Sequence, residues 1–357
     1  MRMGTFVLAG QYPGQSDTES LRRAIRCAEV ADEVGLDGVW VAEHHFVPYG
    51  VCPSAVTLAA HLLGRTRQIG VGTAISILTT AHPVALGEQA ALLHLASEGR
   101  FTLGVGRGGP WVDLEVFESD VEELANGFPE SLDLLLRWLN EPRVGADGPR
   151  YSFREVNVVP RPESQPPMVV ACTSPQTVRL AAERGLPMLL GMHVGDEEKA
   201  EMVGLWRSAA AAAGHSPDGD HVSAGVVQVA DSHSEAVETL RRALPGWLRR
   251  GLGAHQTLDG RPRRMRDPLT YTELLCELHP VGDAQLCADR LAATSERTGI
   301  TRFALLAEGS GDIALTELNV RRLADEVLPL LPHRPGAAAR AAAPGTAISS
   351  PAAPATG

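Results

Sequence analysis

Short apolar runs alternate with amphipathic helical segments along most of the chain. The runs occupy residues 6–10, 38–43, 69–76, 100–108, 168–174, 187–192, 222–230 and 302–308. Segments with helical spacing of apolar residues follow at 20–35, 54–66, 83–99, 131–140, 175–185, 197–214, 234–251 and 314–331. The runs are continuously apolar, which is typical of parallel strands with both faces covered. Eight such strand–helix units predict a single (β/α)8 TIM barrel rather than an open doubly wound sheet.

Two segments interrupt this repeat. Residues 150–164 have the pattern of a β excursion before the fifth strand. Residues 253–281 are rich in charge and proline and predict a long loop, and such loops are usually lids or disordered. After Pro335 the chain is mostly Ala, Pro, Ser and Gly, which predicts disorder. We therefore expect a barrel domain at 1–334 with a mobile lid at about 253–281, and a disordered tail at 335–357.

The composition narrows the classes of function. With 357 residues, of which 44% are hydrophobic, the chain can bury a large core. A net charge of −11 argues against binding to nucleic acids or anionic membranes. No apolar run reaches the roughly 20 residues of a membrane span, and the first residues lack the layout of a signal peptide. The five cysteines show no metal-type pairing, which is typical of a reducing cytoplasm. We expect a soluble cytoplasmic protein that acts on a small molecule.

Polar residues gather where the predicted strands end. Glu43, His44 and His45 follow the second strand, and Arg107 ends the fourth. In a barrel these positions lie on the one face that carries active sites. The alternative is that both histidines are polar loop residues that only end a strand. A shared metal ion is disfavoured, because adjacent strand residues point to opposite faces and no HxH, HExxH or cysteine pair accompanies them.

Two turns predict contacts to a ligand. Residues 104–109, GVGRGG, match the G-x-G-x-x-G pattern, but the following PWVDLEV is not the helix start that a dinucleotide site requires. A loop that brings the backbone and Arg107 close to a ligand fits better. Thr173 and Ser174 precede a helix predicted to start near Pro175. Hydroxyls and N–H groups at a helix start favour an anion, with simple N-capping as the alternative.

Several specific strings occur in a particular order and spacing. They are EHHF at 43–46, VGTAI at 71–75, TAHP at 80–83, EGRFTLGVGRG at 98–108 and AAERGLPM at 181–188. From about residue 3 to about residue 332 the chain resembles the bacterial luciferase-type flavin monooxygenases, and within them the catalytic α subunit of luciferase. The resemblance implies a (β/α)8 barrel that binds reduced FMN (FMNH2). Dioxygen (O2) then adds at the flavin C4a, and the (hydro)peroxide oxygenates a small organic substrate.

The resemblance also implies roles for catalytic residues. His44 matches the family's catalytic histidine, whose imidazole can move a proton at neutral pH. Glu43 and His45 would support the site beside the flavin. His82, in TAHP, and Asp113 coincide with further active-site positions of the family.

Cofactor contacts follow from the same resemblance. Ala74 and Ile75 match a non-proline cis peptide that lies against the flavin ring. Arg107, Thr173 and Ser174 fall at positions that cradle the phosphate, where a guanidinium beside N–H donors suits a dianion. The neighbouring Cys172 and Thr177 complete the residues expected to bind the cofactor.

The chain departs from the family pattern at three positions. Gly106 stands where the family has a reactive, nonessential cysteine, which is harmless or widens the pocket. Ala125 replaces a second arginine that contacts the phosphate, and Cys172 replaces a glutamate. The loss of that arginine suits a flavin that binds loosely and exchanges as a substrate.

The predicted lid bears on which subtype the chain is. The catalytic subunit of the family has a long mobile loop there, and its noncatalytic partner lacks it. Residues 253–281 retain the loop, with a basic cluster of Arg261, Arg263, Arg264 and Arg266. A catalytic chain is therefore expected. A noncatalytic flavin-binding or subunit-type protein is one alternative, and an oxidoreductase of the same barrel that transfers hydride with the deazaflavin F420 is another.

The implied partners are a small-molecule substrate, a separate flavin reductase and a second copy of the chain. The chain has neither a reductase-type nicotinamide fingerprint nor a second domain, so the reduced flavin must come from elsewhere. Ala- and Leu-rich faces at 54–66 and 83–99 match helices that pack subunits together in the family. Because closed two-fold pairing is the commonest arrangement, we expect a homodimer.

Overall fold

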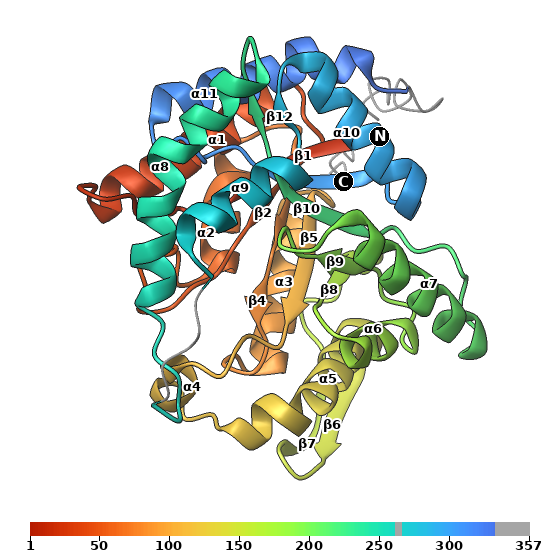
Figure 1. Cartoon of the computed structure of the whole chain (residues 1–357). Coiled ribbons are helices and arrows are strands. Elements are labelled where there is room, and N and C mark those ends of the chain that lie inside the picture. Colours follow the sequence, from red (N-terminus) through yellow and green to blue (C-terminus); the bar gives the residue numbers. More distant parts are fainter. Residues whose placement is uncertain (261–265, 333–357) are drawn as a thin grey trace, which may run out of the picture.

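The computed structural model of the chain describes residues 1–260 and 266–332 (Figure 1). Three arginines of the predicted basic cluster, Arg261, Arg263 and Arg264, lie outside the described residues. The predicted tail at 335–357 also lies outside them. Among the described residues no helix combines the length and apolarity needed to cross a membrane.

Eight parallel strands close into a barrel, as the sequence predicts. The order of the strands around the barrel is β3, β2, β1, β13, β10, β9, β8 and β5. A pairing between β3 and β5 closes the ring. The two-residue strand β4, Ser76–Ile77, adds to the pairing of β5. The barrel strands are β1 Arg2–Val7, β2 Gly38–Val41, β3 Gly70–Thr73, β5 Phe101–Gly106, β8 Met168–Cys172, β9 Met188–Leu190, β10 Val222–Val226 and β13 Arg302–Leu306.

Alternate residues of these strands belong to two separate apolar clusters, which explains the continuously apolar runs. One cluster joins outward side chains such as Val39 and Leu103 to the surrounding helices. The other joins Phe6, Trp40 and Val169 to each other inside the barrel. The Trp40 indole is so close to β3 that a Cβ on Gly72 would lie 2.7 Å from its ring. The interior is therefore a packed core, and a ligand site must lie at an end of the barrel.

Helices surround the barrel in chain order (Figure 1). They are α1 Asp17–Glu33, α2 Ala55–Arg65, α3 Pro83–Ala96, α5 Phe128–Asn140, α6 Pro175–Ala182, α7 Asp196–Ala212, α10 Ala284–Thr298 and α11 Ile313–Arg322. A π-helical turn at Glu123–Gly127 precedes α5, and helical turns at Leu323–Val327 and Leu328–Leu330 follow α11.

The seventh helix of the ring differs from the prediction. A helix does form over the predicted range 234–251, namely α8, His233–Gly253. The seventh position of the ring is nevertheless occupied by α10, which packs against α7 and against the turn at Leu323–Val327. Instead, α8 lies across the ends of the strands, where its Trp247 donates an indole N–H bond to the Tyr49 carbonyl at 3.0 Å. The face that α10 buries has one large apolar residue, Leu291, among small ones such as Cys287 and Ala288, so its helical pattern in the sequence is weak.

Two further predictions need correction. Within the predicted loop at 253–281, residues Pro268–Leu278 form helix α9, because Asp267 accepts a bond from the Thr270 N–H and Pro268 starts the first turn. A short parallel pairing of β11, Gln228–Val229, with β12, Val281–Gly282, returns the chain to the barrel. The β excursion is a hairpin of β6, Arg143–Asp147, and β7, Ser152–Asn157, so it begins before the predicted residue 150.

Candidate active site at the carboxyl ends of the strands

The carboxylate of Glu43 joins three elements at the end of β2. Its Oε2 accepts the Ala55 N–H at 2.8 Å, at the first turn of α2. Its Oε1 accepts the Ile77 N–H of β4 at 2.9 Å. Acceptor oxygens are favoured at the N-terminus of a helix, where backbone N–H groups lack partners within the helix. Glu43 thus positions the segments on both sides of the predicted site.

His44 is held in its neutral form. Its ring meets the Tyr49 ring edge-on, with centroids 4.9 Å apart. Its Nδ1 is buried and has no hydrogen-bond partner among the described residues. Burial, followed by the nearby His255 and His45, lowers the pKa of His44 to about 3. At neutral pH this imidazole is therefore unprotonated, with one ring nitrogen that donates a hydrogen bond and one that accepts.

His45 lies on the other side of the same turn, among aromatic rings. Its Nε2 is 3.7 Å from Glu43 Oε1, and its side chain is only 8% exposed. Its ring meets the Phe117 ring at 4.8 Å, and Phe117 stacks on Phe46 at 6.0 Å. Phe46 has a φ of 60° and is 58% exposed. A bulky residue with positive φ is uncommon and costs about 1–3 kcal/mol. Because the Phe46 and Phe117 rings stack on each other and are partly exposed, they give the site an apolar edge.

Asp113 is buried close to two histidines. It lies in α4, Val112–Val116, and only 4% of it is exposed. Burial raises the pKa of its carboxyl, and the Leu114 N–H, His45 and His255 oppose that shift.

The prediction that the stretch after Gly109 is not helical is wrong at 112–116. The helix nevertheless has five residues and starts beyond the glycines, so a dinucleotide turn is still not formed.

His255 is a residue of the site that sequence reasoning missed. Its ring lies 4.8 Å from the Trp111 ring and 6.0 Å from the Tyr49 ring, between centroids. A lone histidine in a predicted loop carried no signal by itself. Only the return of the chain after α8 brings it beside Trp111 and Tyr49, which lie 144 and 206 positions earlier.

Backbone pairing holds this returning segment in place. Val112 N–H donates to the Gln256 carbonyl at 2.9 Å, and Leu258 N–H donates to the Pro110 carbonyl at 3.1 Å. Trp111 and Thr257 form an antiparallel bridge between these bonds. The end of α8 is therefore fastened to the loop that connects Arg107 with Asp113.

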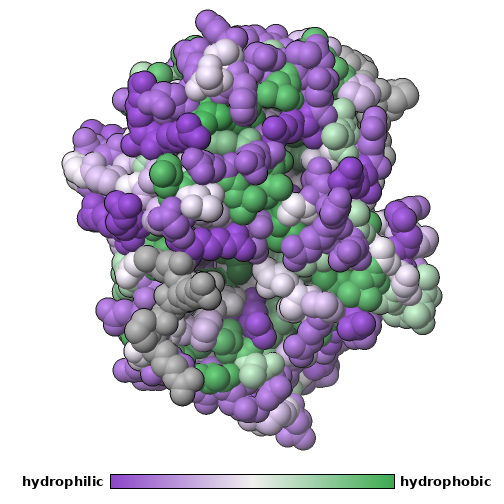
Figure 2. All heavy atoms as spheres, viewed as in Figure 1, coloured by the Kyte–Doolittle hydropathy of each residue, from purple (hydrophilic) through white to green (hydrophobic). Residues whose placement is uncertain are grey.

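The peptide bond between Ala74 and Ile75 is cis, as the resemblance implies. The expectation that Gly106 widens the pocket is wrong, because a Cβ on Gly106 would collide with Cδ1 of Ile75. The Ile75 side chain thus takes the space that a larger residue at position 106 would fill. In the space-filling view the surface is hollowed at the height of β4, between the helices above and the elements around α4 and α5 below (Figure 2).

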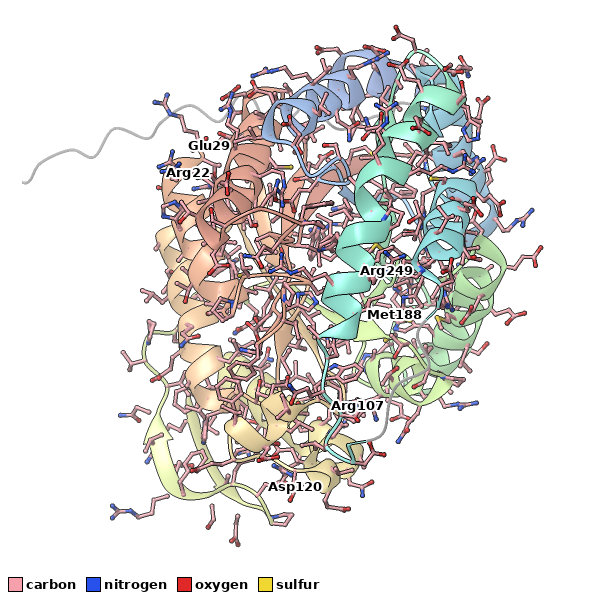
Figure 3. All side chains as sticks on the ribbon, turned by 60° about the vertical axis from the view of Figure 1, so that its left-hand side comes forward. Arg22, Glu29, Arg107, Asp120, Met188 and Arg249 are labelled. Atoms are coloured by element: carbon pink, nitrogen blue, oxygen red, sulfur yellow. The ribbon has the colours of Figure 1, made fainter. Side chains whose placement is uncertain are left out.

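The predicted phosphate cradle combines a guanidinium with a helix start. Arg107 lies beside the lower end of α8 (Figure 3), and its guanidinium has no ion-pair or hydrogen-bond partner among the described residues. The Ser174 hydroxyl accepts the Thr177 N–H at 3.3 Å as the N-cap of α6. Thr177 Oγ1 in turn accepts the Thr173 and Ser174 N–H groups at 3.3 and 3.2 Å. An unpaired guanidinium and a helix start fit a phosphate dianion.

Two other predicted residues do not meet His44. The Cys172 thiol adjoins the cradle and donates to the Thr177 carbonyl at 3.4 Å. The Cys172 thiol is buried in the outer core, where burial raises its pKa to about 12. His82 is the N-cap of α3, and its Nδ1 accepts the Val84 N–H at 3.2 Å. Its ring meets Tyr151 at 5.1 Å and lines a separate cavity of about 430 Å³. The described contacts do not join His82 to His44. Nor do three His, Cys, Asp or Glu side chains converge as a metal site anywhere in the described residues.

Comparison with known proteins places this site in a family. The family described as luciferase-like monooxygenase matches residues 1–302. The alkanal monooxygenase alpha chain of Photorhabdus luminescens is 29% identical over 354 residues, spanning 94% of this chain and 98% of that protein. The chain therefore belongs to the luciferase-like monooxygenase family, a family of flavin-using oxidoreductases.

Solved structures share the fold. Monooxygenase RslO1 from Streptomyces bottropensis has a TM-score of 0.81 at 24% identity, covering 92% of this chain and 99% of that one. The oxygenating constituent of 3,6-diketocamphane monooxygenase from Pseudomonas putida, in complex with FMN, has 0.74 at 21%, covering 93% and 98%. An F420-dependent secondary alcohol dehydrogenase has 0.72 at 18%, covering 93% and 99%. At these identities the similarity establishes the barrel.

Proposed function

We propose that the chain is a monooxygenase that uses reduced FMN and dioxygen to oxygenate a small organic substrate. The observation that carries the proposal is the neutral His44, with its buried Nδ1, at the mouth of a barrel that also presents Arg107, which is unpaired among the described residues. Reduced FMN supplies the two electrons that activate dioxygen, so that one oxygen atom enters the substrate and the other leaves as water.

Different residues of the site bind the phosphate, position the flavin ring and transfer a proton. Arg107 and the start of α6, with Thr173 and Ser174, hold the phosphate. The segment Ala74–Ile75 would lie along the flavin ring, and Glu43 keeps this segment in place through the Ile77 N–H. His44 moves a proton at the reacting atoms. The exposed rings of Phe46 and Phe117 offer the substrate an apolar surface.

The proposal is tested by supplying candidate cofactors in reduced form. The chain is mixed with reduced FMN or reduced F420, with and without dioxygen, and oxygen consumption and cofactor oxidation are followed. We expect oxygen consumption with reduced FMN only. Oxidation of reduced F420 without dioxygen would instead identify a hydride-transfer enzyme, for which the dehydrogenase of the same fold is a precedent. Oxidation of reduced FMN no different from that without the protein, and no oxidation of reduced F420, would indicate a noncatalytic protein.

The phosphate cradle makes a prediction about FMN affinity. Arg107→Ala should weaken FMN binding by roughly 1.5–3 kcal/mol, the usual worth of a hydrogen bond to a charged group. Riboflavin, which lacks the phosphate, should bind the variant and the wild type equally well. Both affinities are measured by quenching of flavin fluorescence. Arg143→Ala is the control, since Arg143 pairs with Glu155 on the β6–β7 hairpin. Equal wild-type affinity for FMN and riboflavin would contradict the cradle.

Assembly is a further part of the proposal. We propose a homodimer that pairs through α2 and α3, and a separate reductase that supplies reduced FMN. On α3, Leu92 and Leu95 are 57% and 46% exposed in the single chain. Burying such side chains stabilises by about 25 cal/mol per Å² of apolar surface. Sedimentation at micromolar concentration should show a dimer, and Leu92→Asp together with Leu95→Asp should give a monomer. A wild-type monomer would contradict the proposed pairing.

A further inference from the structure

The position of Arg107 depends on its backbone, because the described contacts do not fix its side chain. The residue is half-buried, and its guanidinium has no ion-pair or hydrogen-bond partner among the described residues. A long side chain that moves freely loses rotamer freedom when it binds a phosphate, which weakens the binding. The more firmly the Arg107 backbone is held, the better the guanidinium can be directed at a ligand.

The Thr79 side chain holds this backbone. Its hydroxyl donates to the Arg107 carbonyl at 2.7 Å, and Thr79 is only 3% exposed, so water has little access to the bond. Strand β5 ends at Gly106, one residue before Arg107, and Gly108, one residue after it, has a φ of 74°. Glycine adopts this left-handed conformation readily, and the chain turns there. The Thr79 hydroxyl therefore supplies a donor just where the regular pairing of the strand has ended.

The segment that carries Thr79 is itself fixed at several points. Strand β4 pairs with the end of β5, and beyond it Leu78 N–H donates to the Gly106 carbonyl at 2.9 Å. On the other side, Glu43 accepts the Ile77 N–H at 2.9 Å. Thr79 follows these bonds directly in the chain. Its hydroxyl thus reaches Arg107 from a segment that does not depend on Arg107 for its own position.

The same segment begins at the cis peptide between Ala74 and Ile75. That peptide is the part of the chain proposed to lie along the flavin ring, whereas Arg107 is proposed to bind the phosphate. Thr79 therefore connects the two ends of the proposed flavin site. Without its hydroxyl, Ala74 and Ile75 would still be held by the β4–β5 pairing and by Glu43. Only the phosphate end would lose a support.

We propose that Thr79 determines the preference for FMN over riboflavin by positioning Arg107. Thr79 is a positioning residue, because it acts on the phosphate through Arg107. The alternative is that its hydroxyl only satisfies a buried carbonyl, and the loss of such a bond would affect both flavins alike. The inference rests on the proposed phosphate cradle but not on oxygenation, so binding measurements can test it without turnover.

Thr79→Val removes the hydroxyl and keeps the shape of the side chain. The dissociation constants of oxidised FMN and riboflavin are measured by quenching of flavin fluorescence, and their ratio gives the preference for the phosphate. We expect this preference to fall by about 2- to 10-fold, the effect of one neutral hydrogen bond on an equilibrium constant. Riboflavin affinity should stay unchanged. Thr79→Ser, which retains the hydroxyl, should keep the wild-type preference.

Thr80→Val is the matched control. The Thr80 hydroxyl donates to the Ile77 carbonyl at 3.1 Å within its own turn, so its loss should leave the preference unchanged. If Thr79→Val does not fold, Thr79→Cys is compared with Thr79→Ser, because sulfur is the weaker donor at the same position. The cysteine variant should then show the lower preference. An unchanged preference in the variant without the hydroxyl, an equal fall in Thr80→Val, or equal weakening of both flavins would overturn the proposal.

A double variant shows whether Thr79 acts through Arg107. In an Arg107→Ala background, Thr79→Val should change the preference for FMN no further, because residues that act as one unit are not additive. A further fall of the same size as in the wild-type background would contradict a role through Arg107.

Oxygen consumption with reduced FMN separates this inference from the proposed function. A lower preference in Thr79→Val, in a chain whose wild type consumes oxygen, would support both. The same fall in a chain whose wild type consumes no oxygen would support the role of Thr79 and contradict the monooxygenase. An active wild type whose preference for FMN is unaffected by Thr79→Val would leave the monooxygenase intact and reject the role of Thr79.

Discussion

His44→Ala is expected to oxygenate substrate about 10²–10⁴-fold more slowly than the wild type, the usual contribution of general acid–base assistance. Burial, His255 and His45 lower the pKa of His44 to about 3, so the ring is unprotonated throughout the neutral range. Its ring contacts Tyr49 and has no part in the phosphate cradle. FMN affinity should therefore be nearly unchanged, and oxygen consumption can persist as release of hydrogen peroxide.

The measurement is stopped-flow absorbance of the complex with reduced FMN mixed with oxygen, together with product and peroxide yields. His61→Ala is the control, since His61 is an exposed histidine on α2. If His44→Ala oxygenates substrate as fast as the wild type, then His44 only ends a strand and has no role in proton transfer.

The second large effect concerns stability. Glu308→Ala is expected to lower the free energy of unfolding by about 3–5 kcal/mol, the cost of leaving one member of a buried ion pair alone. Glu308 Oε1 lies 3.3 Å from Arg23 Nε, and both side chains are at most 2% exposed. Its Oε2 also accepts the Leu8 and Ala9 N–H groups at 2.9 and 3.3 Å. The substitution therefore leaves the buried guanidinium without its carboxylate partner, although it keeps the Gln15, Gly10 and Gly311 oxygens, and it leaves two backbone donors without an acceptor.

Urea unfolding followed by circular dichroism measures this loss. Glu317→Ala is the matched control, because Glu317 pairs with Arg26 and Arg321 with both partners about a third exposed. Exposed ion pairs contribute about 0–1 kcal/mol, so this variant should be close to the wild type. Equal stabilities of the two variants would show that the buried pair does not hold the ends of β1 and β13 together.

The site depends on this network because of where Glu308 lies. It follows β13 and fastens the backbone just after β1, and the Tyr12 hydroxyl donates to its carbonyl at 2.8 Å. Tyr12 stacks on Trp247 at 5.6 Å, and Trp247 stacks on Tyr49 at 4.6 Å. The same interactions that stabilise the barrel end therefore also position the ring that covers His44.

The hydrophobic pattern alone was sufficient to predict the barrel. Strands buried on both faces must be continuously apolar, and Val39 and Trp40 of β2 show this directly, since one packs on helices and the other fills the interior. Eight such strands can be buried on both faces by closing into a ring. Active sites of such barrels lie at the ends of the strands, so the sequence alone predicts that Glu43, His44 and Arg107 lie at the active face.

The pattern failed where local signals were weak or spread over small residues. Helix α10 buries Cys287, Ala288 and Thr294, which do not form a conspicuous apolar stripe. Helix α9 begins with the pair Asp267 and Pro268, which marks a helix start as well as a turn. Both segments are more regular than their local sequence patterns indicate.

The sequence by itself determined the periodicity, the ends of the strands and the residue types available for chemistry there. Only the tertiary structure decided which of these side chains meet. It directed the Cys172 thiol into the outer core, put His82 beside Tyr151, and let Ile75 take the space at Gly106. It also brought His255 to Tyr49, because α8 crosses the strand ends rather than returning along the barrel. Contacts between residues far apart in the chain depend on how whole elements pack, and local sequence patterns carry no record of that packing.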